Sequence, residues 1–186
     1  MRRLAAIGVA AAALVFVTPA HAGNWSLGAN MGLSFESPDG GDMVTVIGWP
    51  SSVLGLRVGF VGQNPVHEVY VDSGLEVLST KGFSQHAVQV TGNYQYNFKS
   101  TGSNAPFLTG GLGFASVGAS DGSSVSAVAT LFGGGIGLRH KMANGNGTLR
   151  GEARFDHNTE GKDGGAVIVS AANTFGIKLG FDLWGK

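Results

Sequence analysis

The chain has 186 residues, with 12 acidic and 12 basic side chains and no cysteine. This length suits one domain, and the lack of cysteine excludes both a disulfide scaffold and a lipid anchor on an N-terminal cysteine. The balanced charge, with no basic stripe of interleaved aromatic residues, argues against nucleic-acid binding. Glycine is abundant, at 32 residues, and only 13% of residues are charged, which favours closely packed strands.

The first 22 residues have the pattern of a secretory signal peptide. Arg2 and Arg3 precede an uncharged, mostly apolar run over 4–17, and Ala20 and Ala22 form a small-x-small cleavage site. The apolar run is shorter than the ~20 residues that a membrane-spanning helix needs. We therefore expect cleavage after Ala22 and one mature domain over residues 23–186.

From Trp25 onward, apolar and polar residues alternate with a period of two, which is the repeat of a β strand with two different faces. Turn-rich stretches interrupt the alternation and divide it into eight segments. The predicted strands are 25–35, 53–61, 66–78, 86–98, 105–118, 125–140, 147–157 and 166–184.

Charged side chains share one face of these strands. In the seventh segment every second residue from Arg150 to Asp156 is charged, and the positions between are Gly, Ala and Phe. The third and eighth segments divide in the same way, and we add Arg57 and Arg139 to the face presumed to line the interior. The charges predicted to face the interior are Arg57, Glu68, Asp72, Glu76, Arg139, Arg150, Glu152, Arg154, Asp156, Lys178 and Asp182.

This segregation predicts the fold class, because a basic side chain that faces lipid at the midplane costs roughly 2–4 kcal/mol. We expect an all-β, eight-stranded antiparallel transmembrane up-and-down β-barrel, with the charges in the lumen and the apolar face toward lipid. A soluble periplasmic lipocalin-like barrel, with apolar residues inside, is the alternative.

The loops follow from this topology. If both chain ends lie in the periplasm, the connections 36–52, 79–85, 119–124 and 158–165 are outside the cell. Residues 43–49 are also β-prone, and because single-chain bacterial barrels have even strand numbers, we place them within the first outer loop.

The last strand resembles the assembly signal of outer-membrane barrels, a polar residue, glycine, an apolar residue and an aromatic residue in fixed spacing. The matching positions are Thr174, Gly176, Leu179 and Phe181, although the chain continues for five residues beyond them. The segments 106–114, 132–139 and 149–155 are similar to the fifth to seventh strands of small barrels of the OmpA and OmpX type. The resemblance implies the outer membrane and a fold that serves many activities.

Two observations bear on chemistry. The histidines of the mature chain are scattered singly, so we expect neither a metal site nor a cofactor. Residues 157–159, His-Asn-Thr, resemble the His-x-Ser pair of lipid A deacylases, with Glu160 or Asp163 as the acidic partner, but Thr replaces Ser and the rest of that motif is missing.

The narrow bore of an eight-stranded barrel favours a static plug of ion pairs over a pore. The lumen glycines, 111, 113, 133, 135 and 137, would leave water-filled space for a narrow leak. We expect a non-enzymatic outer-membrane protein, acting in envelope integrity or surface presentation. A small pore for ions or solutes and a lipid-modifying enzyme are the alternatives.

The expected partners follow from this location. They are outer-membrane lipid and lipopolysaccharide, with the barrel assembly machinery and periplasmic chaperones during biogenesis. We expect a monomer that does not bind nucleic acid.

Overall fold

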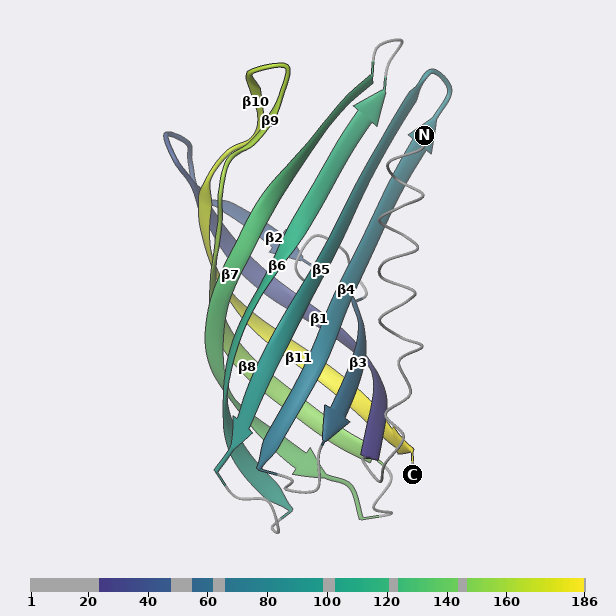
Figure 1. Cartoon of the computed structure of the whole chain (residues 1–186), viewed down its shortest axis with the longest axis vertical. Helices are drawn as coiled ribbons and strands as arrows, with labels where there is room; N and C mark the ends of the chain where they lie inside the picture. Colours follow the sequence, from purple (N-terminus) through teal and green to yellow (C-terminus); the bar gives the residue numbers. More distant parts are fainter. Residues whose placement is uncertain are drawn as a thin grey trace.

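The computed structural model describes residues 24–47, 55–61, 66–98, 103–120, 124–143 and 147–185. In this part of the chain, eight strands form the wall of a closed antiparallel barrel (Figure 1). These wall strands are β1 (Asn24–Pro38), β3 (Gly55–Val61), β4 (His67–Thr80), β5 (Phe83–Asn97), β6 (Asn104–Ser120), β7 (Ser124–Lys141), β8 (Gly147–Asn158) and β11 (Ala172–Gly185). The predicted fold class is confirmed.

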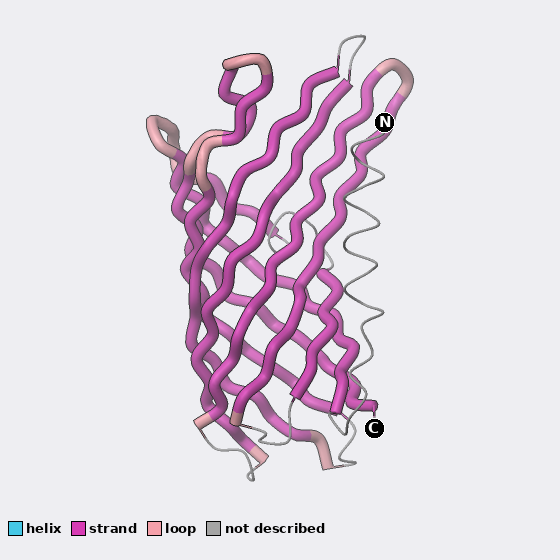
Figure 2. The backbone as a smooth tube through the Cα atoms, viewed as in Figure 1, coloured by secondary structure: helices cyan, strands magenta, loops and turns pink. Residues whose placement is uncertain are grey.

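Each wall strand pairs with its neighbours in sequence order, and β1 closes the barrel by pairing with β11 from Trp25–Gly185 to Pro38–Ala172. The tube in Figure 2 is strand over nearly all of its described length. Strands β4 to β7 reach further than the others at the end where β4 turns into β5 (Figure 1). The described residues contain no helix that is long and apolar enough to cross a membrane.

Three short strands lie near this end of the barrel (Figure 1). Strand β2 (Val44–Ile47) pairs with Leu33–Glu36 of β1, so the β-prone segment in the first outer loop extends a hairpin and adds no ninth wall strand. Residues 48 and 49 of that predicted segment lie outside the described residues. The other two strands, β9 (Gly161–Asp163) and β10 (Ala166–Val169), pair only with each other.

The prediction that 166–184 forms one continuous strand is wrong. Gly164 and Gly165 adopt positive φ angles of 57° and 91°. Two consecutive residues in that region form a tight hairpin turn, which glycine adopts without steric cost. The turn folds Ala166–Val169 back onto β9, and the last wall strand begins only at Ala172.

The β9 segment covers an edge of β7 that extends beyond β8. The pairing of β7 with β8 ends at Leu131 and Asn158. Past that point the Thr159 amide donates to the Thr130 carbonyl at 2.9 Å, and the Ser126 amide donates to Asp163 at 3.0 Å. Exposed strand edges invite pairing with other chains, so these bonds protect the projecting part of β7.

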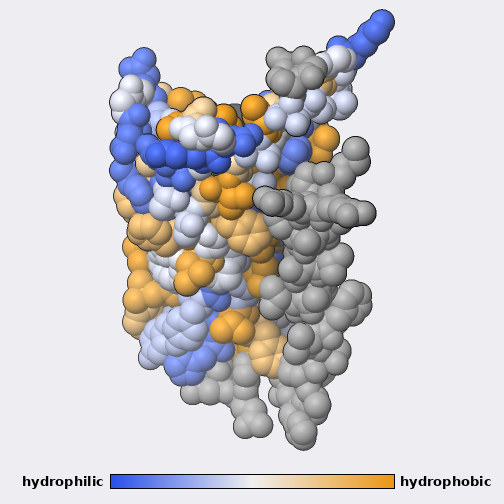
Figure 3. Space-filling view, turned by 45° about the horizontal axis from the view of Figure 1, so that its top comes forward, coloured by the Kyte–Doolittle hydropathy of each residue, from blue (hydrophilic) through white to orange (hydrophobic). Residues whose placement is uncertain are grey.

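The outer wall of the barrel is apolar. Alternate residues of β11, such as Phe175, Ile177 and Leu179, are at least half exposed, while Gly176 and Lys178 between them are buried. Figure 3 shows hydrophobic residues over the wall below a hydrophilic rim. The lipocalin-like alternative, which needs the apolar residues inside, is therefore wrong.

Candidate functional site

The interior of the barrel holds the charged side chains that the alternation singled out. Eight of them, Arg57, Glu68, Asp72, Arg150, Glu152, Arg154, Lys178 and Asp182, are at most 4% exposed. Arg139 and Asp156 are the two partly exposed members, at 15% of their side chains. The side chain of Glu76, the eleventh predicted position, lies outside the described part of the structure. The ten described charges comprise five basic and five acidic groups.

Five of these charges form one chain of ion pairs around the bore. Arg57 bridges two strands, with Glu68 of β4 at 2.8 Å and Asp182 of β11 at 3.7 Å. Glu68 also binds Arg139 of β7 at 3.3 Å, and Asp182 also binds Arg150 of β8 at 2.8 Å. The chain therefore links five different strands through ion pairs. In three of these four pairs the arginine also donates a charge-assisted hydrogen bond, which is stronger than a neutral one.

A second set lies on β8 itself. The Arg154 Nε donates to Asp156 at 2.8 Å, and its Nη1 donates to Glu152 at 3.3 Å. The Thr109 hydroxyl on β6 adds a 2.8 Å bond to Glu152. Arg154 therefore takes both of its carboxylate partners from its own strand and, among the described residues, none from a neighbouring one. Residues two apart on a strand point to the same side, and the long arginine side chain reaches both carboxylates.

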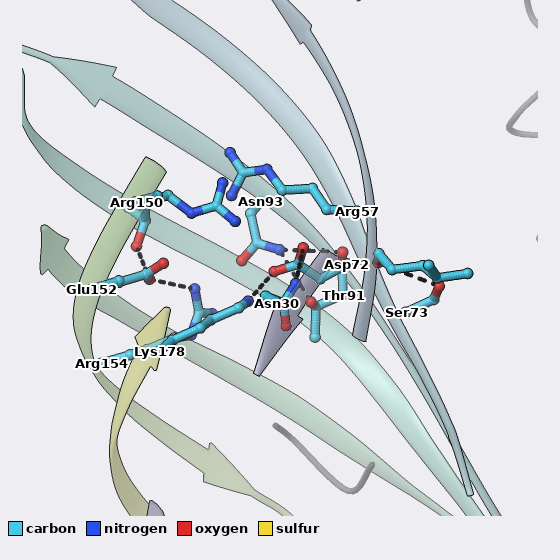
Figure 4. A network of polar contacts seen from close by, with 12 residues as sticks. Asn30, Arg57, Asp72, Ser73, Thr91, Asn93, Arg150, Glu152, Arg154 and Lys178 are labelled. Atoms are coloured by element: carbon cyan, nitrogen blue, oxygen red, sulfur yellow. Dashed lines mark hydrogen bonds and ion pairs between the residues drawn. The ribbon is translucent and has the colours of Figure 1, made fainter. Parts of the chain in front are cut away.

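The third set joins strands that are not neighbours in the wall. Lys178 of β11 pairs with Asp72 of β4, and the Asn30 amide of β1 donates to the same carboxylate at 3.4 Å (Figure 4). Because strands β1 and β3 separate β11 from β4 in the sheet order, this pair spans the bore. Each described interior charge thus has a partner of opposite sign.

Glycines on β7 make room for these side chains. A β-carbon at Gly135 would lie 2.6 Å from the carbonyl oxygen of Ala153 and 2.9 Å from Glu152 Oε1. At Gly133 it would overlap the Asp156 carboxylate, and at Gly137 the ring of Phe107. Protein side chains thus occupy the space beside these three glycines, which the sequence suggested as a water-filled leak.

Neutral residues complete the interior, and sequence reasoning did not single them out. The ring of Tyr70 lies 3.2 Å from Arg57 Cζ, a cation–π contact. Gln95 accepts a bond from Arg57 at 3.3 Å and donates one to Glu68 at 3.3 Å. Tyr70 lies on the same face of β4 as Glu68 and Asp72, and Gln95 of β5 is directly opposite Glu68. These positions on the charged face are the sequence signal that would have found both residues.

The residues that resemble a deacylase pair are not assembled. His157 Nδ1 contacts the Asn173 side chain at 2.9 Å, and the Thr159 hydroxyl accepts from the Thr130 amide at 3.0 Å. Of the two candidate acids, Glu160 pairs with Lys162 at 2.8 Å and Asp163 accepts from the Ser126 amide. Among these described residues, the geometry provides no hydrogen bond from the histidine to the hydroxyl or to either acid. Over the described residues, no group of three or more His, Asp or Glu side chains could hold a metal ion.

The proposed assembly signal lies on β11, the strand that closes the barrel. Thr174 and Gly176 have the interior parity, and Leu179 and Phe181 have the parity of the outer wall. Strand β11 pairs with β8 on one side and β1 on the other, so these positions sit beside the closing seam.

Together, the closed wall, apolar exterior and ion-paired interior define the class of transmembrane β-barrels, which must satisfy their backbone internally and face lipid with apolar side chains. No protein-family model and no curated protein matches the chain.

Solved structures of small outer-membrane proteins do match. Neisserial surface protein A has a TM-score of 0.64 at 12% identity, covering 88% of this chain and 99% of that one. A major outer membrane protein from Thermus thermophilus has a TM-score of 0.54 at 15% identity, covering 89% of this chain and 100% of that one. Ail, the attachment invasion locus protein of Yersinia pestis, has a TM-score of 0.50 at 15% identity, covering 88% and 100%. These similarities confirm the small outer-membrane barrel fold.

Proposed function

We propose that this chain is an exported, non-enzymatic outer-membrane barrel whose interior is closed by ion pairs. In this proposal it contributes to envelope integrity or presents its outer turns at the cell surface. The observation that best supports a closed interior is that the described lumen charges, five basic and five acidic, pair with one another and come from five of the wall strands.

The physical argument against a pore is that the paired side chains extend from the wall strands and fill the bore. An eight-stranded barrel has an interior that side chains can fill. Lys178 and Asp72 cross the bore, and Arg57 stacks on Tyr70 while it pairs with Glu68 and Asp182. A continuous water path would have to separate such partners, and removing one partner of a buried pair costs several kcal/mol.

The location rests on the exterior and on the N-terminal segment. The exposed apolar side chains of the wall need lipid around them. Residues 1–22 have the signal-peptide pattern and lie outside the described residues. The partners that follow are outer-membrane lipid and lipopolysaccharide around a monomeric barrel, with periplasmic chaperones and the barrel assembly machinery during biogenesis.

Fractionation of the bacterium that makes the protein tests the location. We expect the protein in the outer membrane, with Gly23 as its first residue and with faster gel migration before boiling than after. Recovery of a soluble periplasmic protein would overturn the proposal.

The cellular role is tested by deletion and complementation. We expect the deletion strain to become sensitive to detergent and to large antibiotics if the barrel supports the envelope. Restoration by a variant in which the β9–β10 hairpin is shortened to a turn would assign the function to the barrel itself. Failure of that variant, despite normal assembly, would assign it to the presented surface. Unchanged sensitivity in the deletion strain would overturn the envelope-integrity role.

A further inference from the structure

Two buried guanidinium groups converge inside the barrel. The Cζ of Arg57 lies 3.2 Å from the centroid of the Tyr70 ring, and the Cζ of Arg150 lies 6.0 Å from the same centroid. Both arginines pair with Asp182, at 3.7 and 2.8 Å. Figure 4 shows their guanidinium groups directed toward each other.

The ion-pair chain around them carries a surplus positive charge. It contains three guanidinium groups, from Arg57, Arg139 and Arg150, and two carboxylates, from Glu68 and Asp182. The compensating surplus lies in the β8 set, where Arg154 is shared by two carboxylates. The described interior is neutral as a whole, and the ion-pair chain that contains Arg57 and Arg150 has one positive charge in excess.

Several buried donors at this position have no hydrogen-bond partner among the described groups. They are Arg57 Nε and Nη1, Arg150 Nε and Nη2, and the Tyr70 hydroxyl. The acceptor Asp182 Oδ1, which lies 3.7 Å from Arg57 Nε, also has no hydrogen-bond partner. The residues that carry them are at most 4% exposed. Buried polar groups are almost always hydrogen-bonded, and those that look unpaired often indicate an unseen water or ion.

We propose that a small monovalent anion of the chloride type binds between Arg57, Arg150 and Tyr70. Such an ion accepts several N–H and O–H bonds at once and supplies the single negative charge that the local chain lacks. A water molecule would satisfy the donors but leave the surplus charge uncompensated, and a multivalent anion would exceed that charge. The ion is a fixed part of the closed interior, and its presence does not depend on the cellular role of the barrel.

The direct test uses bromide in place of chloride. The protein is refolded from urea into detergent in bromide, so that the buried site can capture the ion as it closes, and is then crystallised. We expect an anomalous bromide peak within hydrogen-bond distance of both guanidinium groups. An ordered water there without anomalous signal, or bromide only at the surface, would overturn the proposal.

Variants separate this site from general salt effects. The urea midpoint is measured in chloride and in gluconate at equal ionic strength. We expect a higher midpoint in chloride for the wild type and for the surface variant Lys162→Gln, and no difference for Arg150→Gln. If Arg150→Gln does not fold, Tyr70→Phe keeps the ring and removes one donor, and its bromide occupancy should fall. Equal wild-type midpoints in the two salts, or undiminished bromide in Tyr70→Phe, would contradict the assignment.

Discussion

At the scale of single residues, burial decides how much each ion pair contributes. Arg154 is 3% exposed and holds two carboxylates, whereas the Lys162–Glu160 pair of the outer hairpin is 55% and 48% exposed. Exposed pairs contribute about 0–1 kcal/mol because water solvates both partners. Buried pairs behave differently, since removal of one partner leaves the other charge without compensation.

Alanine substitutions should therefore separate the two kinds of pair. We expect Arg154→Ala to lower the free energy of unfolding by about 3–5 kcal/mol. Arg150→Ala should cost less than Arg154→Ala, because Asp182 keeps Arg57 as a partner at 3.7 Å. The exposed control Lys162→Ala should change stability by less than about 1 kcal/mol. Urea titrations of the protein refolded in micelles measure all three. Equal shifts for the buried arginine variants and the exposed lysine variant would show that the inside and outside of β8 are wrongly assigned.

Interior glycines provide a second contrast at this scale. We expect Gly135→Ala to destabilise the barrel by roughly 1–3 kcal/mol, as overpacking does, because the new methyl meets backbone and the Glu152 carboxylate. The matched control is Gly151→Ala on β8, where the nearest atom to the new methyl is Leu179 Cδ2 at 3.7 Å. The thermal unfolding midpoints of the two variants report the difference. A control as unstable as Gly135→Ala would mean that the glycines do not serve to fit the charged side chains.

At the scale of elements, the period-two alternation predicted all eight wall strands, because one face meets lipid and the other meets charge. It could not predict the β9–β10 hairpin, since the apolar residues 166–169 read equally well as the start of β11. The fold there depends on the positive φ angles of Gly164 and Gly165. The alternation also placed Arg154 and its two carboxylate partners in the interior, but it did not show that they pair with one another. Side-chain rotamers decide whether an arginine binds carboxylates on its own strand or on neighbouring strands.

Strand β11 carries the proposed assembly signal, and a pair of aromatic residues can test it. We expect Phe181→Ala to lower the amount of heat-modifiable protein in the outer membrane several-fold while refolding of the purified protein is unchanged. The control Phe175→Ala removes an outward-facing ring from the same strand outside the matched positions. It should not impair assembly in the cell. Equal loss for both variants would indicate lost packing in place of a recognised signal.

At the scale of the whole molecule, the apolar outer wall and the ion-paired interior are the two faces of the same alternating strands. The apolar outer face of the wall is stable only in contact with lipid. The strand alternation places the ten described interior charges on the opposite face, away from the lipid. Burial of so many charges is tolerated because they occur in balanced numbers and in contact with one another. In the closed barrel that we propose, stability and closure depend on the same residues.

Conductance across a planar lipid bilayer tests this central claim most directly. The protein is inserted from a preparation whose folded state is verified by heat-modifiable migration, and current is recorded under an applied voltage in potassium chloride. The ion-paired interior predicts no steady conductance from the wild type. It predicts ion flow through the double variant Arg154→Gly with Lys178→Gly. This variant removes the arginine that pairs with both carboxylates of β8 and the lysine that pairs with Asp72 across the bore. Steady open channels from the folded wild-type protein would contradict the closed barrel.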